Sequence, residues 1–388
     1  MTEARAALSV VIPSRNTREL TLACLAALAA AAAARPELSA LEVVLVDDAG
    51  DDGTGDAVAA RHPQVRLLRL EHQAGFTRAA NRGLAAAKGS VMLLLNSDTE
   101  VGGDGAGLAG LLERFAAEPR LGIAGAVLRY PDGAPQWSGG EEPTASWLFA
   151  LASGVPDLLG RAPLYRRWRP ASGTRGTGGK RGKDGPGGGG GEAGECAGRR
   201  PGAVAWVTGA AMAMRRAVWE QVGPLDESFR FYAQDLDFCL RARQAGWAVA
   251  VVPEFEVIHH HGATIQGEGG RRRGSRSGPA APGRPGDGAD LADPADLRTG
   301  ASRGAVHPEL LWTDLLRWAG KRGGAPAARR AARALLAGGR LRLLGRRLAA
   351  PLVPAAERAR FREDSEAFGR ALTAVAALAA AGAARETC

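Results

Sequence analysis

Several side chains in this sequence could bind a metal ion, a phosphate group or a sugar hydroxyl. They are the neighbours Asp47 and Asp48, the carboxylate Asp98, the two carboxylates Asp235 and Asp237, and the histidines at 259–261. Carboxylate and imidazole groups ligate divalent cations, and carboxylates also accept hydrogen bonds from base and ribose groups. Taken singly, each group also has an ordinary structural explanation, as an acidic turn, a helix N-terminus or a surface cluster.

Asp98 lies just beyond an apolar run, Val91–Leu95, and is separated from it by Asn96 and Ser97. The run shows no alternation, which favours a strand buried on both faces of a parallel sheet. Ligands of open α/β sheets bind beyond the carboxyl ends of such strands, so we expect Asp98 to hold a metal-bound diphosphate. The alternative is a turn that caps the next element.

The other carboxylates also fall at the ends of expected elements. The acidic, Gly-rich loop 47–54 follows a second apolar run and could bind a base N–H or a ribose hydroxyl, or form a solvated turn. Asp235 and Asp237 begin an expected helix. Two residues apart on a helix they point roughly 200° apart, so only one readily faces a given pocket.

The three histidines end the second of two expected strands, Ala248–Val252 and Glu256–His260. Alternation along a strand places His259 and His261 on one side and His260 on the other. A metal site and a surface cluster are both consistent with this pattern.

Strands alternate with helices through the first third of the chain, which predicts an α/β fold with a mainly parallel sheet and helices on both faces. The expected strands there are Leu8–Ile12, Leu41–Val46, Val65–Leu70, Val91–Leu95 and Ile123–Leu128. The expected helices are Leu20–Ala34, Thr77–Ala87 and Leu108–Ala117, with a further helix at Asp235–Ala245.

Two Gly-rich stretches, residues 171–200 and about 267–300, bury too little apolar surface to fold, and we expect both to be disordered. We therefore divide the chain into a domain at 1–265, a linker at 266–305 and a C-terminal helical region at 306–388. The helices of the last region are expected to break at Gly323, Gly324, Gly338, Gly339 and Pro351.

The composition narrows the class of protein. The net charge is +9, and much of the excess lies in the Gly-rich and C-terminal stretches, which favours anionic partners for those segments. The stretch between residues 173 and 200 has no aromatic side chains for base stacking, so we do not expect nucleic-acid binding. Four widely spaced cysteines, no apolar span and no secretory signal predict a cytoplasmic protein without structural disulfides.

Five segments, in this order, resemble the family 2 glycosyltransferases of GT-A fold, in particular their bacterial rhamnosyltransferase-like branch. The segments are VVIPSRN, VVLVDDAGDDGT, QAGFTRAANRGLAAAKGSVMLLLNSDT, AWVTGAAMAMRRAVWEQVGPLDESFRFYAQDLDFCLRARQAGW and VVPEFEVIHHHGAT. The resemblance covers about two thirds of the chain, from Leu8 to Thr264. It implies transfer of a sugar from a nucleotide-diphosphate donor to a saccharide or lipid-linked saccharide acceptor, in surface polysaccharide or glycolipid synthesis.

The resemblance also implies a role for each candidate residue. Asp98 would bind Mg²⁺ or Mn²⁺ on the donor diphosphate with His259 close by, and Asp235 would be the catalytic base of an inverting transfer. The residues implied to border the donor nucleotide are Pro13, Arg15, Asp47, Asp48, Arg78 and Asn81, with Asp48 as the base contact. We also expect Trp206, Gly209 and Asp237 near the acceptor.

Three positions depart from the family pattern. Asn96 stands where the first Asp of the Asp-x-Asp element is usual, which leaves one carboxylate for the metal. Gln234 replaces a usual Glu beside the base, and His261 replaces a usual Gly. The loss of the acidic neighbour supports an alternative function, a noncatalytic protein that binds sugar nucleotides or polysaccharides and retains the fold.

The C-terminal region mixes apolar and basic residues. Five apolar side chains recur at near-helical spacing between Leu311 and Trp318, and the stretch from Arg329 to Leu348 combines arginines with leucines. Such helices either pack on the catalytic domain or lie on an anionic membrane surface. The second alternative would make the protein peripheral on the inner membrane face.

Overall fold

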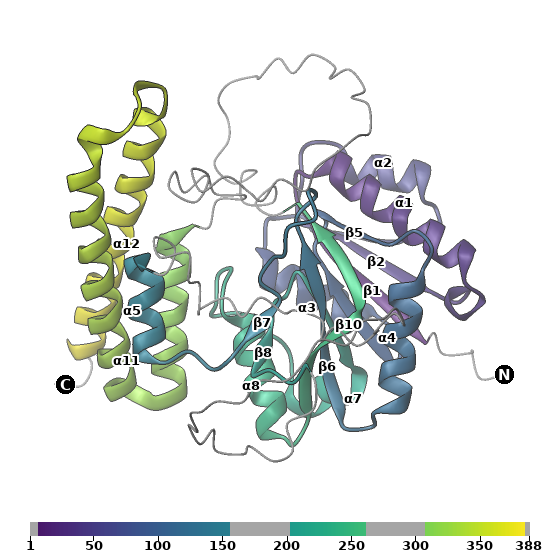
Figure 1. Ribbon diagram of the computed structural model, residues 1–388. Helices are drawn as coiled ribbons and strands as arrows, with labels where there is room; N and C mark the ends of the chain where they lie inside the picture. Colours follow the sequence, from purple (N-terminus) through teal and green to yellow (C-terminus); the bar gives the residue numbers. More distant parts are fainter. Residues whose placement is uncertain (1–6, 156–201, 261–306, 385–388) are drawn as a thin grey trace, which may run out of the picture.

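The computed structural model describes residues 7–155, 202–260 and 307–384. An eight-stranded mixed sheet with helices on both faces forms its centre, in the strand order β3-β2-β1-β4-β9-β6-β10-β5 (Figure 1). The strands are β1 (Leu8–Ser14), β2 (Glu42–Asp47), β3 (Arg66–Arg69), β4 (Val91–Leu95), β5 (Thr99–Val101), β6 (Leu121–Arg129), β9 (Ala211–Arg215) and β10 (Ala248–His259). Strands β7 (Gly139–Gly140) and β8 (Trp206–Val207) form a separate pair.

The expected sheet is confirmed, because four of its seven strand pairings are parallel. The run Val91–Leu95 is β4, and each of its residues is buried. β1 pairs in parallel with both β4 and β2, and its last residue, Ser14, lies opposite Asp47. The segments that follow these three strands therefore meet at one edge of the sheet.

Two strands run against the others. β9 is antiparallel between β4 and β6, and β5 is antiparallel to the end of β10. The two strands expected at 248–260 are one strand, β10, with a register shift between Val252 and Glu256. Pro253 lies in that shift, where its missing N–H removes a ladder hydrogen bond without ending the strand.

Helices cover both faces of the sheet, and each face has its own hydrophobic core. Alternate residues of β1 show the division, since Val11 packs in one core and Val10 and Ile12 pack in the other. The helices outside the C-terminal region are α1 (Arg18–Ala34), α2 (Thr54–Arg61), α3 (Phe76–Ala86), α4 (Ala106–Ala117), α5 (Ala145–Ser153), α7 (Arg216–Val222) and α8 (Gln234–Gln244).

The C-terminal helices α11 (Pro308–Ala349) and α12 (Arg358–Ala384) form a hairpin beside α5 (Figure 1). α11 leaves helical geometry at Gly323 and Gly324, as expected, but the breaks predicted at Gly338 and Gly339 are wrong. Those two glycines are helical and lie against α5 and against the ring of Trp312, where a β-carbon would collide. Gly338 and Gly339 allow close packing of α11 and do not end the helix.

The first part of α11 belongs to the core. Trp312, Leu315, Leu316 and Trp318 are buried with residues of β4, β9 and α8. For this stretch the structure favours packing on the rest of the fold over membrane contact.

The two Gly-rich stretches lie outside the described residues. Within the described ranges, no helix combines the length and the apolar character needed to cross a bilayer.

Candidate active site

Asp98 and His259 come together at the carboxyl edge of the sheet. The antiparallel pairing of β5 with β10 places His259 opposite Thr99, the residue after Asp98. The imidazole Nε2 of His259 lies 3.4 Å from Oδ1 of Asp98, and both side chains are buried. His260 instead pairs with Glu100 at 2.6 Å. Of the two histidines that the structure describes in the 259–261 cluster, His259 is the one beside Asp98.

Gln136 holds the imidazole of His259 from its other side. Its Oε1 lies 2.9 Å from Nδ1 of His259, and its Nε2 donates to the backbone carbonyl of the same residue. An amide oxygen at Nδ1 favours the tautomer with the proton on Nδ1, which leaves the lone pair of Nε2 directed to the Asp98 side. This is the arrangement found around metal-binding histidines. The sequence analysis did not identify Gln136.

The donor set at this place fits a divalent cation. Asn96 has a buried Oδ1 without a hydrogen-bond partner among the described residues, and its Nδ2 lies 3.5 Å from Nε2 of His259, the imidazole atom that faces Asp98. Oxygen and imidazole donors suit Mg²⁺ and Mn²⁺. In the part of the chain that the structure describes, no three His, Cys, Asp or Glu side chains form a closed cage. A cation here would therefore take further ligands from a bound diphosphate and water.

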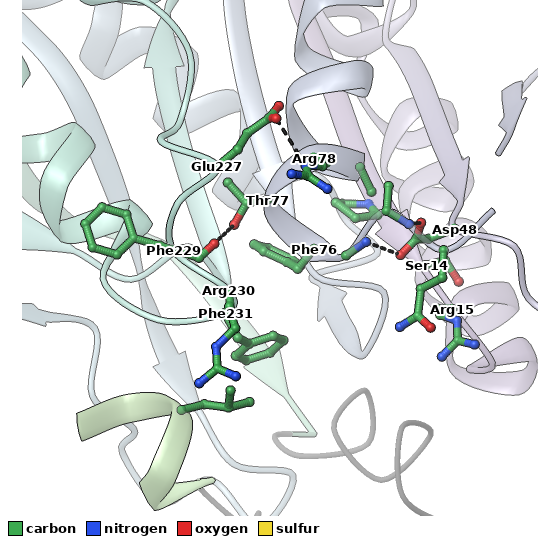
Figure 2. A pocket seen from close by; sticks show the side chains of 16 residues that line it. Ser14, Arg15, Asp48, Phe76, Thr77, Arg78, Glu227, Phe229, Arg230 and Phe231 are labelled. Atoms are coloured by element: carbon green, nitrogen blue, oxygen red, sulfur yellow. Dashed lines mark hydrogen bonds and ion pairs between the residues drawn. The ribbon is translucent and has the colours of Figure 1, made fainter. Parts of the chain in front are cut away.

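A cavity of about 440 Å³ opens at the ends of β1 and β2 and at the start of α3 (Figure 2). Four of the six residues expected at the donor nucleotide line it: Pro13, Arg15, Asp48 and Arg78. Asp47 and Asn81 are not among its lining residues. The cavity wall also carries Phe76 and Phe231, whose ring centroids lie 5.6 Å apart.

The carboxylate of Asp48 organises one wall of the cavity. It accepts hydrogen bonds from the backbone N–H groups of Ala74 at 2.6 Å and Gly75 at 2.9 Å, and so fixes the loop before α3. Gly75 has a φ of 87°, in the region that favours glycine. Asp48 can still accept a hydrogen bond from a ligand, because a carboxylate has about four acceptor sites.

The two expected donor residues outside the cavity have structural partners. Asn81 bonds both backbone groups of Leu225, at 2.9 Å and 3.0 Å, and so ties α3 to the segment that precedes α8. Asp47 is buried and accepts from Gly50 N–H at 2.9 Å. Burial raises the pKa of Asp47 above the usual range of a carboxyl group. Their contact with a nucleotide remains a prediction.

Asp235 occupies the first turn of α8, after Ala233 with a φ of 66°. Its carboxylate accepts hydrogen bonds from the backbone N–H groups of Gly209 and Leu236, each at 2.8 Å. Burial nevertheless raises the pKa of Asp235 above the ordinary value. A positioned carboxylate with a raised pKa has the properties of a general base.

Short hydrogen-bonded connections join the three parts of the site. Ser14, in the cavity wall, contacts Thr17 through their hydroxyls at 3.2 Å, and Thr17 contacts Ser97 at 2.9 Å, next to Asp98. On the other side, Asn96 N–H donates to the carbonyl of Ala210, whose neighbour Gly209 binds Asp235. The cavity, the Asp98–His259 centre and Asp235 therefore belong to one site.

The remaining expected residues flank this site. Asp237 points away from Asp235, as the helical geometry predicted, and pairs with Arg241 and with Lys321 of α11, each at 2.8 Å. Trp206 is buried edge-on to Trp137, with ring centroids 4.6 Å apart. Gly209 is in direct contact with Asp235.

Asp314 of α11 is a second residue that the sequence analysis did not identify. It is fully buried, accepts from the backbone N–H groups of Phe231 and Tyr232 at 3.1 Å, and pairs with Arg317 at 2.7 Å. It thus fixes the segment just before Asp235 from the C-terminal helix. An acidic residue among the core-facing positions of an apolar helix face was the one available signal.

We expect Asp314→Ala to lower the free energy of unfolding by about 3 kcal/mol, because it removes a buried acceptor from two backbone N–H groups and from the partly exposed Arg317. Urea unfolding measures this. Asp364→Ala is the matched control, because Asp364 pairs with Arg346 at 3.6 Å with its side chain 45% exposed, and should cost less than about 1 kcal/mol. Equal losses in the two variants would contradict the role of Asp314.

We expect Gln136→Leu to weaken Mn²⁺ binding in the presence of a nucleoside diphosphate by about 10- to 100-fold, since it frees the imidazole of His259 to rotate and change tautomer. Titration calorimetry measures the affinity. Gln221→Leu removes a comparable amide that binds Trp247 at 2.7 Å, and should leave Mn²⁺ affinity unchanged. Unchanged affinity in Gln136→Leu would show that Gln136 does not position a metal ligand.

Comparison with protein families identifies the class of the chain. Residues 9–175 match the model of glycosyl transferase family 2, and residues 192–273 match glycosyltransferase like family 2. The matched ranges make up more than half of the chain, and the chain belongs to the family 2 glycosyltransferases. Its α/β fold is accordingly of the GT-A type that the resemblance implied.

Among curated proteins, the chain is 30% identical over 233 residues to an N-acetylglucosaminyl-diphospho-decaprenol L-rhamnosyltransferase of Mycobacterium tuberculosis. The match covers 57% of this chain and 66% of that protein, just under two thirds of its length. The O-antigen biosynthesis protein RfbC of Myxococcus xanthus is 24% identical over 66% of this chain and 17% of its own. A 60-residue segment is 37% identical to the rhamnosyltransferase WbbL of Escherichia coli, over 15% of this chain and 23% of WbbL.

Among solved structures, GalNAc-T7 with UDP, GalNAc and Mn²⁺ is 16% identical, with a TM-score of 0.45, covering 66% of this chain and 44% of that one. The TarS structure of S. aureus is 15% identical, with a TM-score of 0.44, over 90% of this chain and 46% of that one.

Proposed function

We propose that this protein is a metal-dependent, inverting glycosyltransferase that moves a hexosyl or rhamnosyl group from a nucleotide-diphosphate donor to a hydroxyl acceptor. The observation that carries the proposal is the linked site, in which the cavity, the Asp98–His259 centre and Asp235 are joined by hydrogen-bonded segments. A saccharide or lipid-linked saccharide acceptor, in surface polysaccharide or glycolipid synthesis, agrees with the names of the relatives.

The donor would lie with its nucleotide in the cavity and its diphosphate towards Asp98. Asp48 offers an acceptor to the nucleotide base, and Arg15 gives the cavity positive charge. Arg78 is paired with Glu227 of the same cavity at 3.2 Å. Asp98, Asn96 and His259 would hold Mg²⁺ or Mn²⁺, which when bound neutralises the charge that develops on the leaving diphosphate. Gln136 keeps His259 in the orientation that this requires.

Asp235 would accept the proton of the acceptor hydroxyl as that oxygen attacks the anomeric carbon. The attack comes from the face opposite the leaving diphosphate, so the anomeric configuration inverts in one displacement. The N–H groups of Gly209 and Leu236 hold the carboxylate in place, and Asp314 fixes the segment before it.

A noncatalytic protein that binds sugar nucleotides or polysaccharides is the second candidate, and Gln234 favours it. Gln234 stands beside Asp235 and is buried, and its Oε1 has no hydrogen-bond partner among the described residues. A neutral amide gives the adjacent carboxyl group no like-charge repulsion that would raise its pKa further.

Release of nucleoside diphosphate from a panel of nucleotide sugars, with Mn²⁺ and saccharide or lipid-linked acceptors, tests the proposal. We expect acceptor-stimulated release with at least one donor, and its loss on chelation with EDTA. Donor binding by titration calorimetry without turnover of any donor would favour the binding protein. Turnover that persists in EDTA would contradict the metal-dependent step.

A further inference from the structure

The second half of α11 carries an unusual row of exposed leucines. The four most exposed large hydrophobic side chains of the described residues are Leu341, Leu344, Leu348 and Leu352, with exposed fractions of 43%, 54%, 72% and 85%. They lie in one short segment, and their exposure rises steadily towards the turn that connects α11 to α12. In a monomeric protein, exposed apolar side chains that gather in this way mark an interaction site.

Helical spacing places these leucines on one face. The first three follow each other at intervals of three and four residues, and Leu352 lies a further four residues along, in the short 3-10 turn Ala350–Leu352. The core-facing residues of this half of α11 are others, Ala331, Ala332, Leu335, Gly338 and Gly339, which are buried. The leucines therefore lie outside the core-facing side of α11.

Arginines surround this row. Arg340, Arg347, Arg358 and Arg362 are exposed on the same half of α11 and on the start of α12. Neighbouring arginines are used internally: Arg342 donates to backbone carbonyls of α5, and Arg346 stacks on Phe361. Three exposed acids, Glu357, Glu363 and Glu366, lie in the same segment, and Asp364 pairs with Arg346. With seven arginines against four acids, residues 340–366 keep a net charge of +3. We call the four leucines and the four exposed arginines the hairpin tip.

Figure 1 shows the turn between α11 and α12 at the top of the hairpin, beyond the part that α5 covers. The contacts of α11 are chiefly with α5 and α12. The tip therefore projects from the catalytic part.

We propose that the hairpin tip binds the surface of an anionic lipid bilayer. Leucines on a projecting helical turn can enter the headgroup and upper acyl region, while the arginines reach anionic headgroups with their guanidinium groups and keep their stems in the apolar zone. A second copy of this chain is a poorer occupant. A two-fold contact through the tip would place two segments with the same net positive charge against each other.

This inference narrows the membrane-surface alternative that the sequence analysis stated for the stretches Leu311–Trp318 and Arg329–Leu348. The Leu311–Trp318 stretch is in the core, and the surface lies further along, at residues 340–362. The proposal stands independently of the proposed sugar transfer, because vesicle binding needs neither the nucleotide-sugar donor nor the catalytic base Asp235. A protein that binds vesicles without transferring sugar would leave it intact.

Co-sedimentation of the full-length protein with phosphatidylcholine vesicles, with and without phosphatidylglycerol, tests the proposal. We expect binding to the anionic vesicles and at least about tenfold less to neutral ones. The triple variant Leu344→Ser, Leu348→Ser, Leu352→Ser should bind at least about tenfold more weakly, from the apolar area that it removes. Arg340→Glu with Arg347→Glu should bind at least about tenfold more weakly to the anionic vesicles, since each arginine contributes about 1 kcal/mol near such a surface.

Phe149→Ser is the control for an exposed apolar residue elsewhere, since Phe149 is 38% exposed on α5, and it should bind vesicles as the parent protein does. Far-ultraviolet circular dichroism and thermal melting confirm that each variant is folded. The proposal is overturned if the parent protein does not sediment with anionic vesicles, or if the leucine variant binds as well as the parent. A concentration-dependent dimer that the leucine variant dissolves would assign the tip to self-association instead.

Discussion

Asp235→Asn is expected to lower the rate of sugar transfer by about 10²- to 10⁴-fold, the usual contribution of a general base, while donor binding is retained. The substitution conserves the side-chain shape, but the amide has one oxygen and keeps only one of the two hydrogen bonds that Oδ2 and Oδ1 accept from Gly209 and Leu236. The measurement is a comparison of nucleoside diphosphate release with donor affinity in the two proteins. Near-normal transfer by the variant would remove Asp235 from the mechanism.

The pH dependence of transfer provides a second measurement on the same residue. A base must be ionised, and burial raises the pKa of Asp235 above that of an exposed Asp, about 3.9. Transfer should therefore fall as the pH is lowered through this raised pKa, at a higher pH than an exposed carboxylate would give. The residual activity of Asp235→Asn should lack this acidic limb.

Asp226→Asn is the matched control for Asp235→Asn. Asp226 lies on the segment before α8, and its pKa is lowered to about 2, chiefly by its hydrogen bonds to Lys321 and Ser228, which outweigh the opposing effect of burial. The substitution removes a carboxylate near the base without touching the acceptor oxygen, so we expect transfer at close to the parent rate. A loss as large as that of Asp235→Asn would indicate that the segment as a whole, and not the base, limits the reaction.

Asp98→Ala is expected to weaken Mn²⁺-dependent binding of a nucleoside diphosphate by more than about 100-fold, since loss of an outer-shell partner alone costs about 10- to 100-fold. The substitution removes the only carboxylate in the Asn96–Asp98 triplet. Calorimetric titration with and without Mn²⁺ separates the metal-dependent part. We expect weak metal binding by the parent protein without the nucleotide, because one carboxylate, one amide and one imidazole leave several positions to phosphate and water.

Asp104→Ala serves as its control. The carboxylate of Asp104 accepts from the N–H of Ala106 at the start of α4, and its loss should leave nucleotide affinity unchanged. If Asp98→Ala binds the nucleotide with unaltered Mn²⁺ dependence, the cation does not lie at Asp98.

Much of the sheet could be predicted because its signal is local. Val91–Leu95 is apolar without interruption and became β4 with the bounds expected, and the helix expected at Asp235 is α8. The strand after Ala248 was divided wrongly, because Pro253 looks like an end in the sequence while its neighbours keep the pairing with β6 on both sides. Strand order was not predictable, since it depends on pairings between segments far apart.

The candidate site was predicted unevenly for a similar reason. Asp98, Asp235 and His259 were found because the order of five segments resembles a family, not because any of them is distinctive alone. Gln136 and Asp314 were not predicted from the sequence, since each acts through one or two hydrogen bonds to a residue distant in the sequence. A glutamine in a loop and an aspartate in a helix have no local pattern that signals such a partner.

The position of β9 bears on how the protein is made. β9 lies between β4 and β6, yet its residues leave the ribosome long after both of those strands. Until then one edge of β4 and both edges of β6 lack their partner strands, and unpaired edges are templates for association with other chains. The central sheet can be completed only once Ala211–Arg215 has been synthesised, so the sheet edge at which Asp98 follows β4 forms late in translation.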